Sequence, residues 1–306
     1  MASVGFVLLL FRRALSAWWN DNVPRLGASL AYYTLFAIAP VLLVAIAVAG
    51  LAFGPEAVRG EIVGQLDELV GRDGAQAIQN LLEGASRPQS GRIATIVGGV
   101  TFVFAATGAF LELQAALNTI WRVTPKPEAN PVSFVIDRVR SFGLVVAIGF
   151  LLMVSLAVSA ALAAAAGWLD RMAPGLPLLW NAINVVVSLG VITALFALLY
   201  FFLPDVTLRW RDVAVGAFVT ALLFTIGKYV IGLYLGQSAT ASTYGAAGSV
   251  VVLLLWVYYS SQVVLLGAEF TRIYAEHAGS RPRPESFAET DQGAPGKATG
   301  RPTETS

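Results

Sequence analysis

The sequence contains no cysteine and only one histidine, His277, among its 306 residues. The lack of cysteine excludes disulfides, thiolate catalysis and cysteine-based metal sites, and a single histidine excludes a histidine cluster. Charged residues are scarce as well, at 13% of the chain, where soluble domains carry about a quarter. The 20 basic and 19 acidic side chains nearly cancel, so no overall positive field is available for a nucleic-acid partner.

Apolar residues are what the chain has in abundance. They make up 57% of the sequence, and the mean hydropathy is +0.70, which is typical of an integral membrane protein. No long polar block indicates a second folded domain, so we expect one all-α, polytopic membrane domain over residues 25–279. Apolar stretches of about 20 residues cross a hydrocarbon core roughly 30 Å thick. Six transmembrane helices of this kind are predicted, near residues 27–53, 93–118, 142–166, 178–203, 213–235 and 245–271.

The first 24 residues do not look like a span, because their apolar run ends early, at Arg12 and Arg13. The positive charges follow the run instead of preceding it, which also argues against a signal peptide. We predict that residues 1–24 form an interfacial amphipathic helix lying along the membrane surface. Its apolar residues recur at helical spacing, as Leu8, Phe11, Leu15 and Trp18.

Two further segments lie outside the spans. Residues 55–92 interleave apolar and acidic residues, which predicts a short helical extracytoplasmic cap. Residues 280–306 are rich in Pro, Gly, Thr, Glu and Arg and are predicted to be a disordered cytoplasmic tail. Fourteen Lys and Arg residues fall on the side that holds both termini, five fall on the other side, and Lys228 lies within a span. Both termini are therefore predicted to be cytoplasmic.

Four motifs in the spans and adjoining loops resemble the YihY/BrkB family of bacterial inner-membrane proteins. They are "ASLAYYTLFAIAPVLL" (28–43), "LNTIWRV" (117–123), "WRDVAVGA" (210–217) and "YGAAGSVVVLLLWVYYSSQVVLLGAEFTRIYA" (244–275). The resemblance runs from about residue 20 to 278 and implies a six-helix bundle in the inner, or plasma, membrane. It implies no settled activity, because members are described mostly as membrane proteins, some of them linked to virulence or serum resistance.

The family formerly carried the label ribonuclease BN, which the residues do not support. Metal-assisted RNA cleavage needs a cluster of carboxylates or histidines beside a basic groove, whereas the acids here are scattered among loops. The chain has no Walker-type phosphate loop, and His277 has no convincing partners for a hydrolase triad. We therefore expect neither an enzyme nor a bound cofactor or metal.

Polar residues near the predicted cytoplasmic ends of spans one, two and six form a candidate cluster. Charged residues in spans usually face the bundle interior or a wet cavity, because facing lipid costs about 2.5–3.5 kcal/mol on insertion scales. A structural role is the alternative, since Glu269 can pair with Arg272 one turn later and Glu112 lies close to the headgroups. The members of the cluster are Tyr32, Tyr33, Glu112, Asn118, Gln262 and Glu269.

A lysine, Lys228, lies inside the apolar run "FTIGKYVIGLYLG" (224–236). It can snorkel to the outer interface along its four-carbon stem. Alternatively, it faces inward beside Asn184, which lies at a similar depth, and offers a positive charge to an anionic solute. Lys228 and Asn184 together form a candidate anion site.

Two classes of function fit these observations. In the first, the bundle is a transporter or flippase-like permease for an anionic or lipid-linked solute. In the second, it is a non-transporting envelope or virulence-associated factor that acts through protein partners. The bilayer is the partner that the composition requires; a second copy of the chain or other envelope proteins would be further partners, and nucleic acid is not expected.

Overall fold

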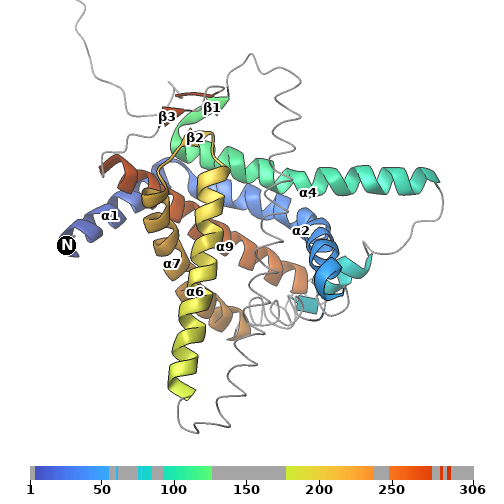
Figure 1. Cartoon of the computed structure of the whole chain (residues 1–306). Helices are drawn as coiled ribbons and strands as arrows, with labels where there is room; N and C mark the ends of the chain where they lie inside the picture. The colour runs from blue at the N-terminus through green and yellow to red at the C-terminus, as the bar shows by residue number, and fades with distance from the viewer. Residues whose placement is uncertain are drawn as a thin grey trace, which may run out of the picture.

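The computed structural model describes residues 4–54, 60, 75–76, 78–84, 92–125, 177–237, 248–277, 283–284 and 288–290. Helices dominate this part of the chain, as the composition predicts (Figure 1). The named helices are α1 (Val4–Asn20), α2 (Val23–Phe53), α4 (Arg92–Trp121), α6 (Pro177–Phe202), α7 (Trp210–Gln237) and α9 (Gly248–His277).

Four stretches in these helices are long and apolar enough to cross a membrane. They are Val23–Leu43 in α2, Val185–Phe202 in α6, Trp210–Ile231 in α7 and Val250–His277 in α9. These match four of the predicted spans, so the chain is a multi-pass helical membrane protein. The predicted second span lies in α4, and the predicted third span, 142–166, lies outside the described residues. The count of six spans therefore stays a prediction.

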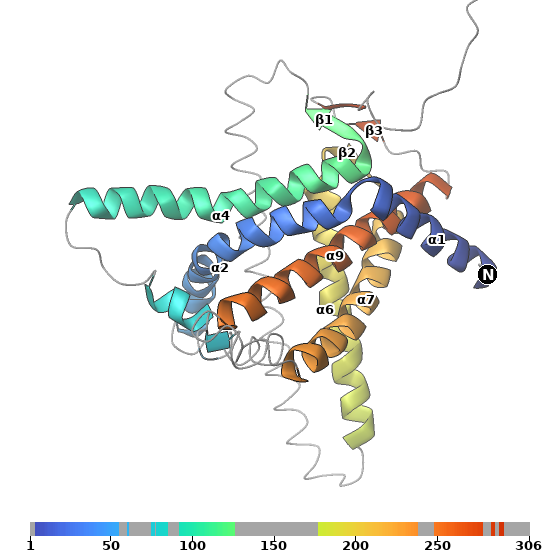
Figure 2. The same ribbon diagram turned by 180° about the vertical axis from the view of Figure 1, so that it is seen from behind.

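The helices converge at one end of the molecule and diverge at the other. α9 packs against α1, α2, α4 and α7, while α2 runs beside α4 and α6 beside α7. In Figures 1 and 2 the Arg92 end of α4 and the Pro177 end of α6 point away from each other. The turn from α1 to α2, the end of α4 and the end of α9 lie together at the convergent end.

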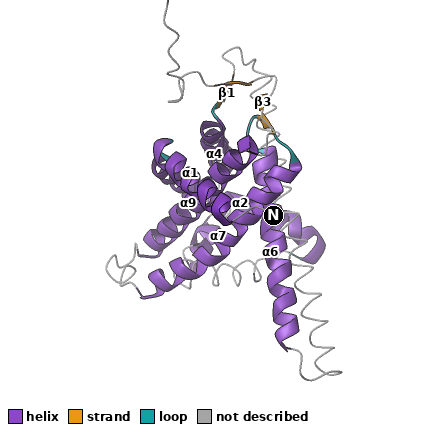
Figure 3. Ribbon diagram, turned by 90° about the vertical axis from the view of Figure 1, so that its left-hand side faces the viewer, coloured by secondary structure: helices purple, strands orange, loops and turns teal. Residues whose placement is uncertain are grey.

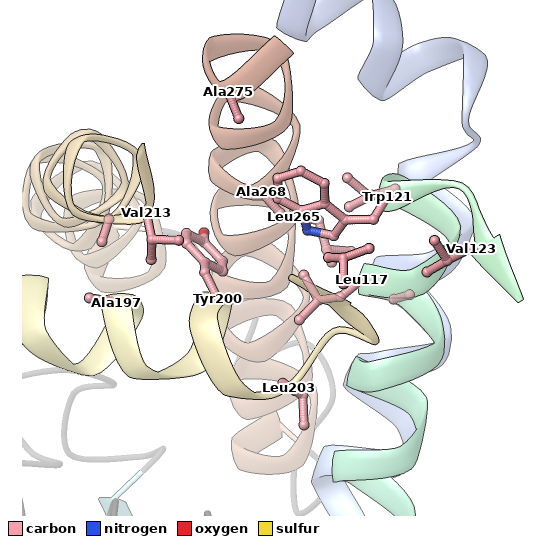
Figure 4. Packing of buried hydrophobic residues seen from close by; sticks show 14 of the residues in the cluster. Leu117, Trp121, Val123, Ala197, Tyr200, Leu203, Val213, Leu265, Ala268 and Ala275 are labelled. Carbon is pink, nitrogen blue, oxygen red and sulfur yellow. The ribbon is translucent and has the colours of Figure 1, made fainter. Parts of the chain in front are cut away.

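The largest buried cluster lies at this convergent end. Leu117 of α4, Tyr200 of α6 and Leu265 of α9 are fully buried and meet there (Figure 4). A second cluster joins α2 and the start of α9 around Ile46 and Leu253. Burying such side chains stabilises the fold by about 1.5–3 kcal/mol each in water, but within lipid the gain comes from close packing instead.

Close packing at the convergent end depends on glycine. A Cβ atom at Gly267 of α9 would lie 2.0 Å from Thr220 Oγ1 and 2.6 Å from Tyr200 Oη. A Cβ at Gly216 of α7 would lie 1.9 Å from Thr271 Oγ1. Since no side chain fits at these distances, α6, α7 and α9 can approach this closely only with glycine at both positions.

The N-terminal helix α1 packs one face against α9. Leu10 and Ala14 are buried against Phe270 and Ile273. Of the apolar residues predicted to share one face, Phe11 and Trp18 pack against the protein. Leu8 and Leu15 are exposed, as is Trp19. α1 therefore has an apolar protein-facing side and a second apolar stripe, Leu8, Leu15 and Trp19, that is free to meet lipid.

Part of the predicted cap and part of the predicted tail are described. Ile78 and Leu82 lie in a helical segment, 78–84, and pack in the cluster around Ile46 and Leu253. Two short antiparallel pairs then involve the tail: β1 (Val123–Pro125) with β4 (Ala288–Thr290), and β2 (Val206–Thr207) with β3 (Arg283–Pro284). Figure 3 shows β1 and β3 beyond the end of α4.

The prediction of a disordered tail over 280–306 is therefore wrong for β3 and β4. Backbone hydrogen bonding to an exposed edge needs no apolar side chains, so a composition-based argument does not detect it. The remaining tail residues, and most of the predicted cap over 55–92, lie outside the described residues.

Candidate functional site

Charged side chains form ion pairs at the convergent end of the bundle. The chain also passes from α6 to α7 at this end (Figure 2). This end is rich in guanidinium groups because arginine ends or follows several apolar segments. Those on the described elements here are Arg12, Arg13, Arg25, Arg122, Arg209, Arg211, Arg272 and Arg283.

The centre of this end is a pair of oppositely charged residues on α9. Glu269 is completely buried, and Arg272 donates to its Oε2 atom from Nη2 at 2.8 Å and from Nε at 3.2 Å. Arg272 also donates from Nη1 to Glu276 Oε1 at 3.0 Å. The spacing of three and four residues places these side chains on successive turns of one helix face. One guanidinium therefore holds two carboxylates of its own helix.

The pair extends to other elements through Asp21, in the turn between α1 and α2. Asp21 Oδ2 lies 3.8 Å from Arg272 Nη2, and Asp21 Oδ1 lies 3.9 Å from Arg122 Nη2 at the end of α4. We call Asp21, Arg122, Glu269 and Arg272 the charged network; Glu276, whose side chain is 49% exposed, lies at its edge. The network links α4, the α1–α2 turn and α9 through side chains alone.

Arg122 occupies an unusual backbone conformation for an arginine. Its φ angle is +56°, in the left-handed region, and its N–H donates to Thr119 O at 3.1 Å as α4 ends. Helices commonly end with glycine in this conformation, because a Cβ atom there costs roughly 1–2 kcal/mol. An arginine at such a position indicates a use for its guanidinium group.

A pocket of about 500 Å³ adjoins the charged network. Its wall combines two guanidinium groups with a hydroxyl, an amide and one carboxylate, so it is rich in hydrogen-bond donors. Arg13 is anchored to the end of α9, where it donates to His277 Nε2, while His277 Nδ1–H donates to Ile273 O at 2.8 Å. The residues of this α1–α4 pocket are Arg13, Ser16, Ala17, Asn20, Asp21 and Arg122.

A second buried carboxylate, Asp205, lies in the loop after α6. Asn118 Nδ2 donates to Asp205 Oδ2 at 2.7 Å, and Gln114 Nε2 donates to Asp205 Oδ1 at 3.1 Å. The backbone N–H of Asp205 donates in return to Asn118 Oδ1 at 2.9 Å. Gln114 and Asn118 are four residues apart, so they share one face of α4, and Arg122 follows directly after the end of this helix. The last turns of α4 and the residue after them therefore contact both the Asp205 loop and Asp21 of the charged network.

The candidate cluster of six polar residues is only partly assembled. Asn118 and Glu269 lie at the convergent end, where both are buried. Gln262 lies two turns before Glu269 on the same face of α9. It contacts α2 at Gly27, where an added Cβ atom would lie only 2.0 Å from Gln262 Nε2. Neither amide atom of Gln262 has a hydrogen-bond partner.

The other three members lie elsewhere. Tyr32 and Tyr33 are exposed and stack edge to face, with ring centroids 5.8 Å apart. Glu112 is half-buried on α4, about 160° around the helix from Gln114 and about 120° from Asn118, so it lies away from the face that binds the Asp205 loop. These three side chains are separate from the charged network.

Lys228 lies far from the convergent end. It is sixteen residues along α7 from Asp212, or about 24 Å at the helical rise. It is half-buried, and its Nζ atom lies 5.1 Å from the centroid of the exposed Tyr229 ring. The side chain of Asn184 lies outside the part that the structure describes, so the pairing of Lys228 with Asn184 stays a prediction.

Sequence reasoning missed Asp21, Arg122 and Asp205 as site residues, because loop charges were counted only for topology. One signal was available: Gln114 and Asn118 are polar residues four apart at the end of an apolar helix, and Arg122 follows four residues later. The described residues contain no group of three His, Asp or Glu side chains that could hold a metal ion.

Comparison with known proteins places this arrangement in a family. The family model described as "Virulence factor BrkB" matches residues 14–290. A UPF0761 membrane protein of Ralstonia nicotianae is 31% identical over 263 residues, which are 85% of this chain and 57% of that protein. UPF0761 membrane proteins of Rhodospirillum centenum and Methylibium petroleiphilum are each 30% identical, over 87% and 85% of this chain and 57% and 64% of their own lengths.

The chain thus spans between half and two thirds of the length of these relatives. No solved structure matches it. The family match begins within α1 and continues through the other helices and the charged network to β4, and it agrees with the four motifs found in the sequence. The chain belongs to the YihY/BrkB family of membrane proteins.

Proposed function

We propose that this protein is a flippase-like permease of the bacterial inner membrane that moves an anionic or lipid-linked solute. The observation that carries the proposal is the charged network, whose Glu269 and Arg272 are buried at one end of the apolar bundle and which adjoins the donor-rich α1–α4 pocket. A charge inside a membrane bundle is costly and is typical of a solute or ion pathway. The excess of Lys and Arg on one side supports cytoplasmic termini, which would make the convergent end the cytoplasmic side.

The network offers a way to couple solute binding to helix position. Asp21 approaches Arg122 and Arg272 only to 3.9 and 3.8 Å, longer than a charge-assisted hydrogen bond. An anion in the α1–α4 pocket would compete with Asp21 for Arg122. A released Asp21 would then pair more closely with Arg272, which draws the α1–α2 turn toward α9.

The proposal can be tested in cells by an untargeted comparison of envelope lipids and exported metabolites. Strains would lack the protein or carry the wild type, Glu269→Gln or Glu276→Gln. Glu276 is a matched control, because it pairs with the same arginine yet its side chain is 49% exposed. We expect one anionic species to change in the deletion strain and with Glu269→Gln, and to return with Glu276→Gln. An unchanged set of anionic species in the deletion strain would refute the proposal.

A non-transporting envelope factor is the second candidate, favoured by the family description as a virulence factor. α7 also exposes an apolar face that includes Phe218, Ile226 and Val230, which a protein partner could cover as well as lipid. A photo-crosslinker at Ile226 should then capture one defined protein in living cells. Capture of lipid alone would count against this second function.

A further inference from the structure

Resting on the proposed permease function, we propose that the α1–α4 pocket binds a phosphate group, either in a phospholipid head group or on a soluble solute. The pocket lies between α1, the α1–α2 turn and the end of α4, and its volume of about 500 Å³ exceeds that of a phosphate group. Four of its side chains can donate hydrogen bonds: Arg13, Ser16, Asn20 and Arg122.

The chemistry of the wall favours an anion with several oxygen atoms. Two guanidinium groups face one carboxylate, that of Asp21, and this carboxylate has Arg272 behind it at 3.8 Å. Guanidinium groups bind phosphate oxygens in pairs, and a hydroxyl and an amide can complete the set. A simple cation would meet two arginines here and would be repelled.

Arg122 is the residue most directly prepared for a ligand. Its Nε atom is buried without a hydrogen-bond partner, and its ion pair with Asp21 is long, at 3.9 Å. Buried donors are rarely left unpaired. The left-handed backbone at Arg122 adds a cost that glycine would avoid, which indicates that the guanidinium is retained for binding.

The pocket also lies at a suitable depth for lipid phosphates. Arg13, Ser16 and Asn20 project from α1, whose exposed stripe of Leu8, Leu15 and Trp19 lies on an adjoining face. A helix with such a stripe rests in the interfacial layer, with its polar side at the level of the head groups. Basic pockets beside membrane helices are known to hold anionic head groups.

The test uses the purified full-length chain in detergent and measures bound lipid by native mass spectrometry. Phosphatidylglycerol is compared with diacylglycerol, which lacks the phosphate, and inorganic phosphate serves as competitor. The variants are Arg122→Gly, which suits the left-handed backbone, and Arg25→Gln, an exposed arginine at the same end that does not line the pocket.

We expect tighter binding of phosphatidylglycerol than of diacylglycerol. Arg122→Gly should weaken it by about tenfold or more, the loss of a charge-assisted hydrogen bond, and Arg25→Gln should leave it within about twofold. Competition by millimolar phosphate would assign the pocket to a soluble phosphate-bearing solute, and its absence to a lipid head group. Equal effects of the two variants, or equal binding of the two lipids, would overturn the proposal.

This outcome is separable from that of the permease. If Arg122→Gly loses the lipid but the deletion strain shows no change in anionic species, the permease proposal fails and the phosphate pocket stands. If the anionic species changes as expected but Arg122→Gly binds lipid normally, the pocket proposal fails alone.

Discussion

Replacing Arg272 by leucine should destabilise the protein far more than replacing its partner Glu269 by leucine. The asymmetry follows from the charged network. Without Arg272, the fully buried Glu269 loses the two hydrogen bonds that Nε and Nη2 of Arg272 donate to it, and Asp21 loses its neighbour at 3.8 Å. Without Glu269, Arg272 still has Glu276 at 3.0 Å and Asp21 at 3.8 Å.

The magnitudes follow from what each substitution leaves behind. Removing one member of a buried pair costs about 3–5 kcal/mol when the remaining charge has no partner, which is the case for Arg272→Leu. For Glu269→Leu the lost charge-assisted hydrogen bonds, about 1.5–3 kcal/mol, are offset because a buried carboxylate is replaced by an apolar side chain. We expect a net loss below about 2 kcal/mol for Glu269→Leu.

The assay is equilibrium unfolding in mixed micelles, followed by tryptophan fluorescence. The double variant Glu269→Leu/Arg272→Leu should be more stable than Arg272→Leu alone, since it removes the uncompensated carboxylate on α9. If Glu269→Leu proves as damaging as Arg272→Leu, or if the two losses simply add, the pairing described for this network is wrong.

Three further predictions concern packing, the tail and the intramembrane lysine. Gly267→Ala should cost about 1–3 kcal/mol of stability, because its Cβ would lie 2.0 Å from Thr220 Oγ1. The control, Gly190→Ala, has nothing within 4 Å of its Cβ and should be neutral or gain up to about 1 kcal/mol. Equal thermal stability of the two variants would contradict this. Truncation after Gly279 removes β3 and β4 and the hydrogen bond from Thr207 Oγ1 to Arg283 O, so it should lower the melting temperature. Truncation after Thr290 keeps both strands and should not lower it. An identical melting temperature for both truncations would show that the strands add no stability. Lys228→Leu should fold at least as well as the wild type. It loses a cation–π contact with Tyr229 worth about 0.5–1 kcal/mol, but it also removes a charge that costs about 2.5–3.5 kcal/mol in a span. A marked loss of stability would reveal a buried acidic partner.

The spans were largely predictable because each is encoded locally. A run of apolar residues of the right length gives a helix wherever it lies, and four such stretches appear as predicted in α2, α6, α7 and α9. Burial of Asn118 and Glu269 at one end also agrees with the expectation that polar residues in spans avoid lipid. The pairing of Glu269 with Arg272 followed from a spacing of three residues.

What the sequence did not reveal depends on partners far along the chain. Asp205 is held by Asn118 across 87 residues, and nothing near Asp205 in the sequence indicates this partner. The role of Arg122 depends on Asp21, which was predicted to lie in the interfacial helix over residues 1–24 and lies in the turn after α1. The packed face of α1 was partly misjudged for the same reason, because α9 decides which side of an apolar helix is covered.

The most direct test of the proposed function is reconstitution of the purified protein into sealed vesicles that contain fluorescent phosphatidylglycerol. Dithionite added outside bleaches the outer leaflet, and slow loss of the remaining signal reports lipid crossing the bilayer. We predict that the wild-type protein accelerates this loss over protein-free vesicles and that folded Glu269→Gln does not, while Glu276→Gln behaves as the wild type. A parallel experiment loads soluble phosphate inside the vesicles and follows its release. If wild-type and protein-free vesicles show equal rates of lipid crossing and equal rates of phosphate release, this bundle is not a permease for phosphate-bearing anions.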